Sequence, residues 1–299
     1  MIELKNVSFQ YSGSKRGVAN IDLMIKDGEC VVFTGKSGCG KTTITRLVNG
    51  LAPKYYKGTK TGNIYIAGEN IDKMQSYDIG EVVGSIFQDP QRQFFSSELE
   101  GEIAFGCENY GFSKFDIQSR TKSAIHKMRL ENIGNVSLDL LSSGEKQRTA
   151  VASVYAMHPQ VFVFDEPTAN LDIQSIFDLR DILRELKQIG KTIIVLEHRL
   201  FYLTELLDRL FVLNDGKIVG EYASEYLMDI QKKHQDIRNL YLDDLEVINQ
   251  NEPKIEETPI LEVKKLSYFH SKTENGSILK DISITAFGNE IIGIIGENG

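Results

Sequence analysis

The sequence is poor in the features that mark membrane-spanning, disulfide-bonded and nucleic-acid-binding chains. No apolar run among its 299 residues approaches the roughly 18 residues that a membrane span requires. The first residues, Met1–Lys5, already include charged side chains and precede no apolar stretch of the kind that a secretory signal contains. We therefore expect a chain that does not cross a membrane by itself.

Cysteine is scarce, and basic residues are outnumbered by acidic ones. Cys30, Cys39 and Cys107 show no C-x-x-C spacing, which argues against a disulfide framework or a zinc site and favours a reducing compartment. Lysine and arginine number 34 against 42 aspartates and glutamates, so the formal net charge is −8. This balance gives no global support for nucleic-acid binding, and we expect no nucleic-acid partner.

The feature around which the chain is organised is a glycine-rich turn. An apolar run, Val31–Phe33, precedes it and a periodic segment, Ile44–Val48, follows it, so the order is strand, turn, helix. Glycines allow successive backbone N–H groups to converge on a phosphate at a helix N-terminus, which itself favours negative charge. The pattern therefore predicts a nucleoside triphosphate site. The turn matches G-x-x-x-x-G-K-[ST] and comprises Gly35, Lys36, Ser37, Gly38, Cys39, Gly40, Lys41, Thr42 and Thr43.

Three side chains of this turn have distinct expected roles. Lys41 would reach the β and γ phosphates, the Thr42 hydroxyl would join the shell of a Mg²⁺ ion, and Thr43 would bond a further phosphate oxygen. The alternative is a glycine-rich connection that binds nothing, which the flanking strand and helix disfavour.

The apolar pattern predicts an α/β fold with a mixed-sheet core and two subdomains. Short alternating pieces between residues 2 and 32, continued by Gly62–Ile66, indicate an antiparallel β subdomain. Two runs that are apolar on both faces, Val161–Phe164 and Ile193–Leu196, indicate a parallel sheet covered on both sides. From about residue 89 to residue 157 the sequence is polar with helical periodicity, which predicts an inserted helical subdomain.

Two further segments complete this first domain. The stretch between the apolar runs has a helix start signal at Asp172 and a stop signal at Gly190. Beyond it, Leu210–Leu213 and Lys217–Val219 flank an Asn-Asp-Gly turn, which predicts either a further parallel strand or a hairpin.

The last residues repeat the first. Leu261–Tyr268 mirrors Ile2–Phe9, and Ile291–Gly299 mirrors the strand and the first four residues of the glycine-rich turn. Residues 243–258 between the copies hold six acidic residues against one lysine, which is linker composition. We therefore expect this polypeptide to be a fragment of a tandem protein. The expected parts are a first domain at residues 1–230, a linker at 231–258 and the start of a second domain at 259–299.

A second loop downstream resembles a known family. Leu141 precedes Ser142, Ser143, Gly144 and Glu145, which open an amphipathic helix whose N–H groups form an anion site with nothing local to bind. Together with the glycine-rich turn, this order resembles the ATP-binding subunits of ABC transporters, whose signature loop is usually L-S-G-G-Q. The resemblance implies a P-loop NTPase of the ABC type that binds ATP and Mg²⁺. It also implies that these four residues contact the nucleotide of a partner domain, although Ser143 adds a Cβ where the family has glycine.

Two carboxylates follow the first apolar run. Asp165 and Glu166 resemble the end of the family's Walker B strand, at the edge of the sheet where open α/β folds bind ligands. Asp165 would hold Mg²⁺, and Glu166 would act as the general base on the attacking water. The alternative is an acidic strand end that caps the next helix, which two adjacent carboxylates make costly without a cation.

Three single residues match further motifs of the family. Gln88 resembles the Q-loop glutamine that contacts Mg²⁺ and water, although a glutamine before Asp-Pro is also an ordinary turn. His198 resembles the histidine that contacts the γ-phosphate, although a lone histidine at a strand end is more often structural. Tyr11 matches the aromatic residue of the family that stacks on adenine. The alternative, an ordinary exposed tyrosine on a strand, explains its presence almost as well. The segment Ala169–Asp172 fits the family's D-loop.

One segment resembles a particular branch of the family. Gln88–Phe95, continued by Glu102–Gly106 and by Glu108 and Asn109, is similar to the ATPases of energy-coupling-factor importers, which take up vitamins and transition metal ions. The resemblance implies that transmembrane subunits dock near Gln88–Phe95 and that the chain lies peripherally at the cytoplasmic face of the cell membrane. The alternative is that the aromatic residues staple the helical subdomain together.

Two other classes of function compete with this interpretation. A soluble tandem ABC ATPase acting in translation or DNA maintenance would be expected to carry a basic linker or arm, but the linker here is acidic. A nucleotide-binding module without hydrolysis would be expected to lack the catalytic carboxylate or histidine, and both are present. The expected ATPase partner is the second half of the tandem protein or another copy of this chain.

Overall fold

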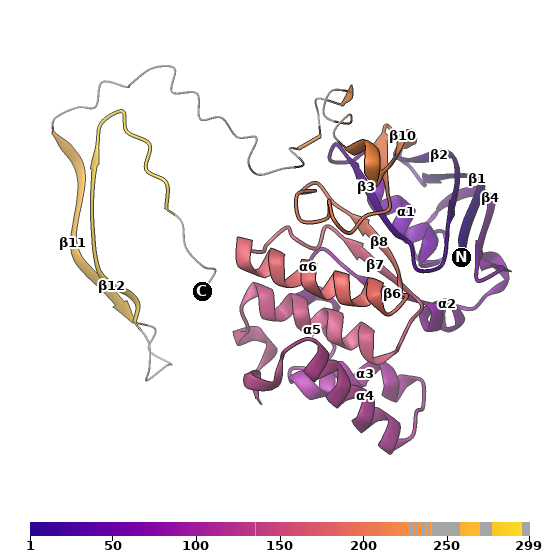
Figure 1. Ribbon diagram of the computed structural model, residues 1–299, viewed down its shortest axis with the longest axis horizontal. Coiled ribbons are helices and arrows are strands. Elements are labelled where there is room, and N and C mark those ends of the chain that lie inside the picture. Colours follow the sequence, from indigo (N-terminus) through magenta and orange to yellow (C-terminus); the bar gives the residue numbers. More distant parts are fainter. Residues whose placement is uncertain are drawn as a thin grey trace. The chain divides into compact units, whose positions relative to one another are not determined.

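The computed structural model describes residues 1–134, 136–227, 258–269 and 277–294, and six single positions between 228 and 240, namely 230, 233, 234, 237, 238 and 240 (Figure 1). Its contacts divide the chain into two units, Met1–Leu242 and Asp243–Gly299, which are described separately here. Most of the predicted linker, 231–258, lies outside the described residues. Among the described residues no helix is both long enough and apolar enough to span a bilayer.

The first unit is built on a six-stranded mixed sheet, as the sequence predicts. The strand order is β10-β9-β3-β8-β7-β6, in which β10 is antiparallel to β9 and every other neighbouring pair is parallel. The segment around residue 214 is therefore both a parallel strand and one arm of a hairpin. The strands are β3 (Cys30–Gly35), β6 (Val83–Ile86), β7 (Val161–Asp165), β8 (Thr192–Leu196), β9 (Arg209–Asn214) and β10 (Lys217–Ala223).

The central strands are apolar on both faces because each face covers a different core. Along β7, Phe162 belongs to one buried cluster and the next residue, Val163, belongs to the other. The first cluster includes the apolar sides of α5 (Ser143–Ala156) and α6 (Ile173–Gln188), and the second includes α1 (Lys41–Val48). Helix α6 begins as expected, because the Asp172 side chain accepts the Ser175 N–H.

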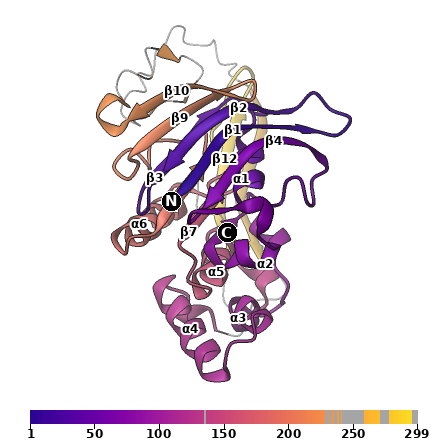
Figure 2. The ribbon, with the colours of Figure 1, turned by 90° about the vertical axis from the view of Figure 1, so that its right-hand side faces the viewer.

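A four-stranded antiparallel sheet packs over the second cluster. Its order is β2-β1-β4-β5, which confirms the predicted antiparallel subdomain, and Figure 2 shows β1, β2 and β4 on the far side of the molecule from α3 and α4. The strands are β1 (Ile2–Tyr11), β2 (Gly17–Ile25), β4 (Gly58–Ile66) and β5 (Glu69–Asn70).

The predicted helical subdomain is present between β6 and β7. It contains α3 (Leu99–Asn109), α4 (Lys114–Lys127) and α5, which join through buried residues such as Ile103 and Ala124. Two elements that precede this subdomain, α2 (Ser76–Val82) and then β6, were not predicted from the sequence. Strand β6 lacks an apolar run because Gly84 lies against α5, where an added Cβ would come within 2.2 Å of Val154.

The second unit contains a hairpin that copies the one formed by β1 and β2. Its strands, β11 (Pro259–Phe269) and β12 (Ser277–Phe287), pair antiparallel. Lys265 has a φ of 49° and donates its N–H to Ser283 Oγ at 3.0 Å, just as Asn6, also at 49°, donates to Asp22 Oδ1 at 2.7 Å. The repeated sequence therefore gives the same bulged hairpin twice, while the division of the chain into tandem domains stays a prediction.

Candidate functional site

The glycine-rich turn joins β3 to α1, as the sequence predicts. Gly35 lies at a φ of 145°, where an added Cβ would come within 2.2 Å of Leu213 O, so only glycine fits. Gly40, at a φ of 110°, precedes the first residue of α1, and that residue is Lys41. The Lys41 side chain is only 3% exposed, and its Nζ donates to Gly35 O at 3.1 Å and to Lys36 O at 3.3 Å. The ammonium is therefore held over the turn that would receive the phosphates.

Three predicted catalytic side chains meet beside Lys41. Its Nζ lies 3.1 Å from His198 Nε2, and the same ring nitrogen lies 3.2 Å from Glu166 Oε1. Gln88 Nε2 donates to Glu166 Oε2 at 3.2 Å. Gln88, Glu166 and His198 follow β6, β7 and β8, three neighbouring parallel strands, and so come together at one edge of the sheet.

The Glu166 carboxylate is stabilised in its ionised form. The hydrogen bond from His198 lowers the pKa of Glu166, and the charge of Lys41 acts in the same direction, while partial burial opposes both. Glu166 is therefore a carboxylate at neutral pH and has the protonation state that a general base requires.

Two of the three predicted metal ligands, Thr42 and Asp165, also lie together, and the third, Gln88, lines the same cavity. Thr42 Oγ1 donates to Asp165 Oδ1 at 3.3 Å, and Asp165 is 8% exposed. Burial, and next the charge of Glu166, raise the pKa of Asp165 from its ordinary 3.8 to about 6. A buried carboxylate that is costly to ionise, beside a hydroxyl at a phosphate-binding turn, fits a hard divalent cation. Among the described residues, no three His, Cys, Asp or Glu side chains are grouped to hold a metal ion. Phosphate and water oxygens would complete the shell of a cation held by Thr42 and Asp165.

Tyr11 lies at the same site but is held by its hydroxyl. The phenol oxygen lies 3.2 Å from Thr43 Oγ1 and accepts a hydrogen bond from Arg46 Nη1 at 3.0 Å. The Arg46 guanidinium also stacks 3.8 Å from the centre of the Tyr56 ring. Nothing in the sequence singled out Arg46, because a basic residue in the last turn of a helix is common. The role of Tyr11 in stacking on adenine stays a prediction.

The second loop forms the start of α5. Ser142 caps α5 and forms a capping box with Glu145, because the Glu145 N–H donates to Ser142 Oγ at 3.3 Å and Ser142 N donates to Glu145 Oε2 at 2.9 Å. Ser142, Gly144 and Glu145 line a cavity of about 50 Å³ whose other walls belong to α5 and α6. The residue before Gly144, Ser143, is the first of α5. Ser142, Ser143, Gly144 and Glu145 thus form one helix start beside α6.

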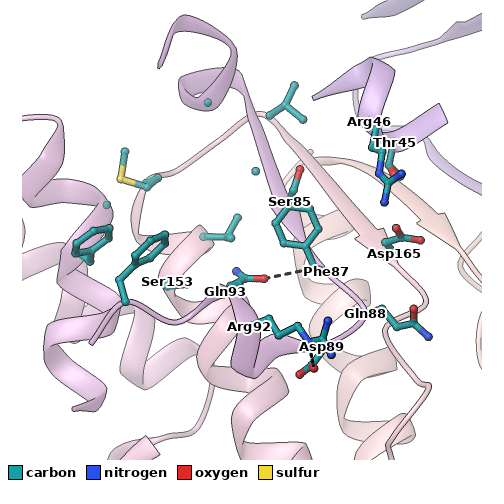
Figure 3. A pocket seen from close by; sticks show the side chains of 18 of the residues that line it. Thr45, Arg46, Ser85, Phe87, Gln88, Asp89, Arg92, Gln93, Ser153 and Asp165 are labelled. Atoms are coloured by element: carbon teal, nitrogen blue, oxygen red, sulfur yellow. Dashed lines mark hydrogen bonds and ion pairs between the residues drawn. The ribbon is translucent and has the colours of Figure 1, made fainter. Parts of the chain in front are cut away.

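A larger cavity, of about 820 Å³, leads from the metal ligands toward the helical subdomain. Figure 3 shows it with Asp165 and Arg46 in one part and Gln88, Arg92 and Gln93 in another. The segment Gln88–Phe95, which includes the short 3₁₀ turn Pro90–Gln93, forms part of its wall.

The two aromatic residues that end this segment behave differently. Phe94 packs against the core, which is what the staple alternative predicts. Phe95 is 75% exposed, and its ring stacks on Phe105 with centroids 4.6 Å apart. Buried Glu102 fixes this end of the segment by accepting the N–H groups of Phe95 and Ser96 at 2.7 and 2.9 Å. Of these two residues, it is therefore Phe95 that offers an aromatic surface to a partner.

Comparison with known proteins decides the family. The sequence model described as "ABC transporter" matches residues 18–169, about half of the chain. The chain belongs to this family. Two putative ABC transporter ATP-binding proteins of Treponema denticola are 38% and 39% identical to it and match all of it. The chain spans 62% of the length of each of these relatives.

Solved structures of ABC ATPases have the same fold. CbiO1 of Clostridium perfringens, described as part of the ABC transporter complex cbiONQ, superposes with a TM-score of 0.69 at 27% identity, over 78% of this chain and 94% of its own. A dimeric ATP-binding cassette, MJ0796, bound to ADP and phosphate, gives a TM-score of 0.66 at 25% identity, over 75% of this chain and 99% of its own. This chain therefore contains an ABC ATPase domain with the P-loop NTPase fold.

Besides Arg46, the sequence reasoning missed Glu197. Glu197 lies directly before His198 and is buried, with its carboxylate bonded to backbone and hydroxyl groups. The available signal was a charged residue that directly follows a strand with no exposed position.

Replacing Asp165 by Asn should stabilise the ABC domain at pH 7 when nucleotide and Mg²⁺ are absent. The pKa of Asp165 is about 6 in the fold against an ordinary 3.8, so between these values the folded state binds more protons than the unfolded state. The free energy of unfolding therefore falls as pH rises from about 4 to about 6. Above pH 6 it stays lower by an amount on the order of 1–3 kcal/mol. Asparagine keeps the size of the side chain and removes this cost.

Thermal melts in EDTA provide the measurement. We expect the melting temperature of Asp165→Asn at pH 7 to exceed that of the wild type by a few degrees, and the difference to shrink near pH 4. An equal difference at both pH values would show that the ionisation of Asp165 is not the cause.

Proposed function

We propose that this chain is the ATP-hydrolysing part of an ABC importer of the energy-coupling-factor type, with a vitamin or a metal ion as the solute. The observation that carries the proposal is the meeting of Lys41, Glu166 and His198 within hydrogen-bond distance at one edge of the parallel sheet. The similarity to CbiO1, which is part of an ABC transporter complex, supports the importer class.

Different residues of the site bind the phosphates, hold the cation and activate the water. Backbone N–H groups of Gly35–Thr43 and the ammonium of Lys41 bind the phosphates, and Lys41 exchanges its contacts with carbonyl oxygens for contacts with phosphate oxygens. Thr42 and Asp165 would hold Mg²⁺, which supplies positive charge against the phosphates. Glu166 accepts a proton from the attacking water, which the Gln88 amide and the His198 ring help to orient.

A complete site needs a second ATPase domain. Ser142–Glu145 form the start of a helix, where backbone N–H groups favour an anion, and their assigned role is to contact a nucleotide that another domain binds. The dimeric state of MJ0796, an ABC cassette of similar fold, supports this arrangement. The partner is either a second ATPase half of the same protein or another copy of this chain.

Transmembrane subunits dock at the cavity beside Gln88–Phe95. This cavity reaches from Asp165 to Phe95, so a helix seated in it contacts the segment that carries Gln88. Docking there holds the chain at the cytoplasmic face of the membrane as a peripheral protein.

ATPase measurements with candidate partners test the function. The purified chain should hydrolyse ATP in the presence of Mg²⁺, and co-expressed transmembrane subunits in lipid vesicles should stimulate it. Stimulation by ribosomes or DNA, with no response to the membrane subunits, would instead support the soluble tandem ATPase of translation or DNA maintenance.

Replacing Phe95 by Ser should weaken the association with the transmembrane subunits. An exposed aromatic anchor at the centre of an interface contributes on the order of 2 kcal/mol or more, so we expect roughly a 30-fold weaker complex. ATP affinity and melting temperature should stay near the wild-type values because Phe95 is 75% exposed.

Phe115 provides the matched control. It is 79% exposed, lies on α4 and does not line the cavity. Phe115→Ser should therefore leave the complex unchanged. If the two variants weaken the complex equally, or if Phe95→Ser lowers the melting temperature by more than a few degrees, docking at the cavity is wrong.

A further inference from the structure

A buried carboxylate directly precedes His198. Glu197 follows the last residue of β8 and is only 2% exposed. Glutamate is almost never buried to this degree unless partners compensate its charge. These partners show what the residue does.

Each oxygen of the Glu197 carboxylate accepts two hydrogen bonds. Oε1 accepts the backbone N–H groups of His198 and Arg199 at 2.6 and 3.1 Å. Oε2 accepts the hydroxyls of Thr168 and Tyr202 at 2.6 and 3.3 Å. Burial, with the charge of Glu197, raises the pKa of Tyr202 well above its ordinary value, so the phenol keeps its proton and acts as a donor.

These contacts connect the two segments that carry catalytic side chains. Thr168 is fully buried and lies two residues after Glu166, in the segment that follows β7. His198 and Arg199 start the segment that follows β8, and Arg199 Nη1 also donates to Thr168 O at 3.4 Å. One carboxylate thus sets the spacing between the backbone of His198 and the turn after Glu166.

We propose that Glu197 is a positioning residue for ATP hydrolysis, whose carboxylate holds the His198 backbone against the Glu166–Thr168 turn so that the imidazole and the general base stay in contact. The inference rests on the proposed ATPase function. A glutamate is required because an amide has one acceptor oxygen and an NH₂ group that can only donate, so it cannot serve four donors.

Glu197→Gln is the principal test, with the whole chain as the protein. We expect kcat to fall roughly 10- to 100-fold because the geometry of the catalytic groups loosens, while the affinity for ATP changes by less than about threefold. Glu29→Gln is the matched control. Glu29 is also a buried carboxylate, but it binds Arg209 at the start of β3, whereas the glycine-rich turn lies at the end of this strand. Its kcat should equal that of the wild type.

The ring resonances of His198 separate positioning from stability. In a sample with ¹³C- and ¹⁵N-labelled histidine, we expect Glu197→Gln to shift the His198 signals and Glu29→Gln to leave them in place. Thr168→Val, which keeps the side-chain volume and removes the 2.6 Å bond, should shift the same signals and serves if Glu197→Gln does not fold.

Two results would overturn the proposal. One is a folded Glu197→Gln or Thr168→Val variant with wild-type kcat and unshifted His198 signals. The other is a loss of activity that follows the loss of folded protein while the His198 signals of the folded fraction stay in place. Absence of hydrolysis in the wild type would instead refute the proposed function, and the His198 signals would still report on Glu197.

Discussion

Replacing Glu166 by Gln should stop ATP turnover and leave ATP binding intact. Glutamine has the size and polarity of glutamate, but its amide cannot accept a proton from water at neutral pH. The pKa of Glu166 is lowered, chiefly by the hydrogen bond from His198, so the wild-type group is the charged base. Loss of a general base reduces rates by roughly 10²- to 10⁴-fold, and we expect an effect in this range on kcat.

Phosphate release and ATP titration measure the two effects separately. Glu205→Gln is a suitable control because Glu205 is exposed and pairs with Arg184 at the surface. Hydrolysis at the wild-type rate in Glu166→Gln would show that another group activates the water. Loss of ATP affinity equal to the loss of turnover would show that Glu166 contributes to binding rather than to chemistry.

The parts of the site that the sequence predicted are those where one local pattern determines the geometry. Lys41 and Thr42 follow from the glycine-rich turn between a strand and a helix, and Asp165 follows from a strand without a polar position. Since β7 and β8 are parallel neighbours, their ends, and therefore Glu166 and His198, meet at one edge of the sheet.

The parts that were missed depend on contacts between distant segments. Strand β6 was not predicted because Gly84 interrupts its apolar pattern. The glycine is required by contact with Val154 of α5, some 70 residues further along the chain. In the sequence, Glu197 looks like an ordinary charged residue. Its role is visible only in the fold, where Thr168 and Tyr202 donate hydrogen bonds to its carboxylate.

The backbone at Glu166 is a further feature that no sequence pattern gives. Its φ is 48°, in the left-handed region that residues other than glycine seldom adopt. The turn is held by a bond from Glu166 N to Leu196 O at 2.8 Å and by one from Ala169 N to Glu166 O at 3.2 Å. Backbone strain of this kind is often found at functional sites, and here it directs the general base toward His198 and Lys41.

Replacing Lys41 by Ala should remove most of the affinity for ATP. The Lys41 ammonium is buried at the end of β3, where the phosphates are expected to bind, and it donates to two carbonyl oxygens of the turn. Hydrogen bonds to charged groups contribute about 1.5–3 kcal/mol each, so the loss of two such bonds predicts roughly a 100-fold or greater rise in Kd.

Titration of ATP and ADP in the presence of Mg²⁺ tests this expectation in a way that stability alone cannot imitate. If Lys41 binds both the β and the γ phosphate, Lys41→Ala weakens the binding of ATP more than that of ADP, because ADP has only one of the two phosphates that Lys41 contacts. Lys26→Ala, at the end of β2 and exposed, should bind both nucleotides like the wild type. Unchanged affinity for ATP in a folded Lys41→Ala protein would show that the glycine-rich turn is not the phosphate site, and the roles of Thr42, Glu166 and His198 would then fail with it.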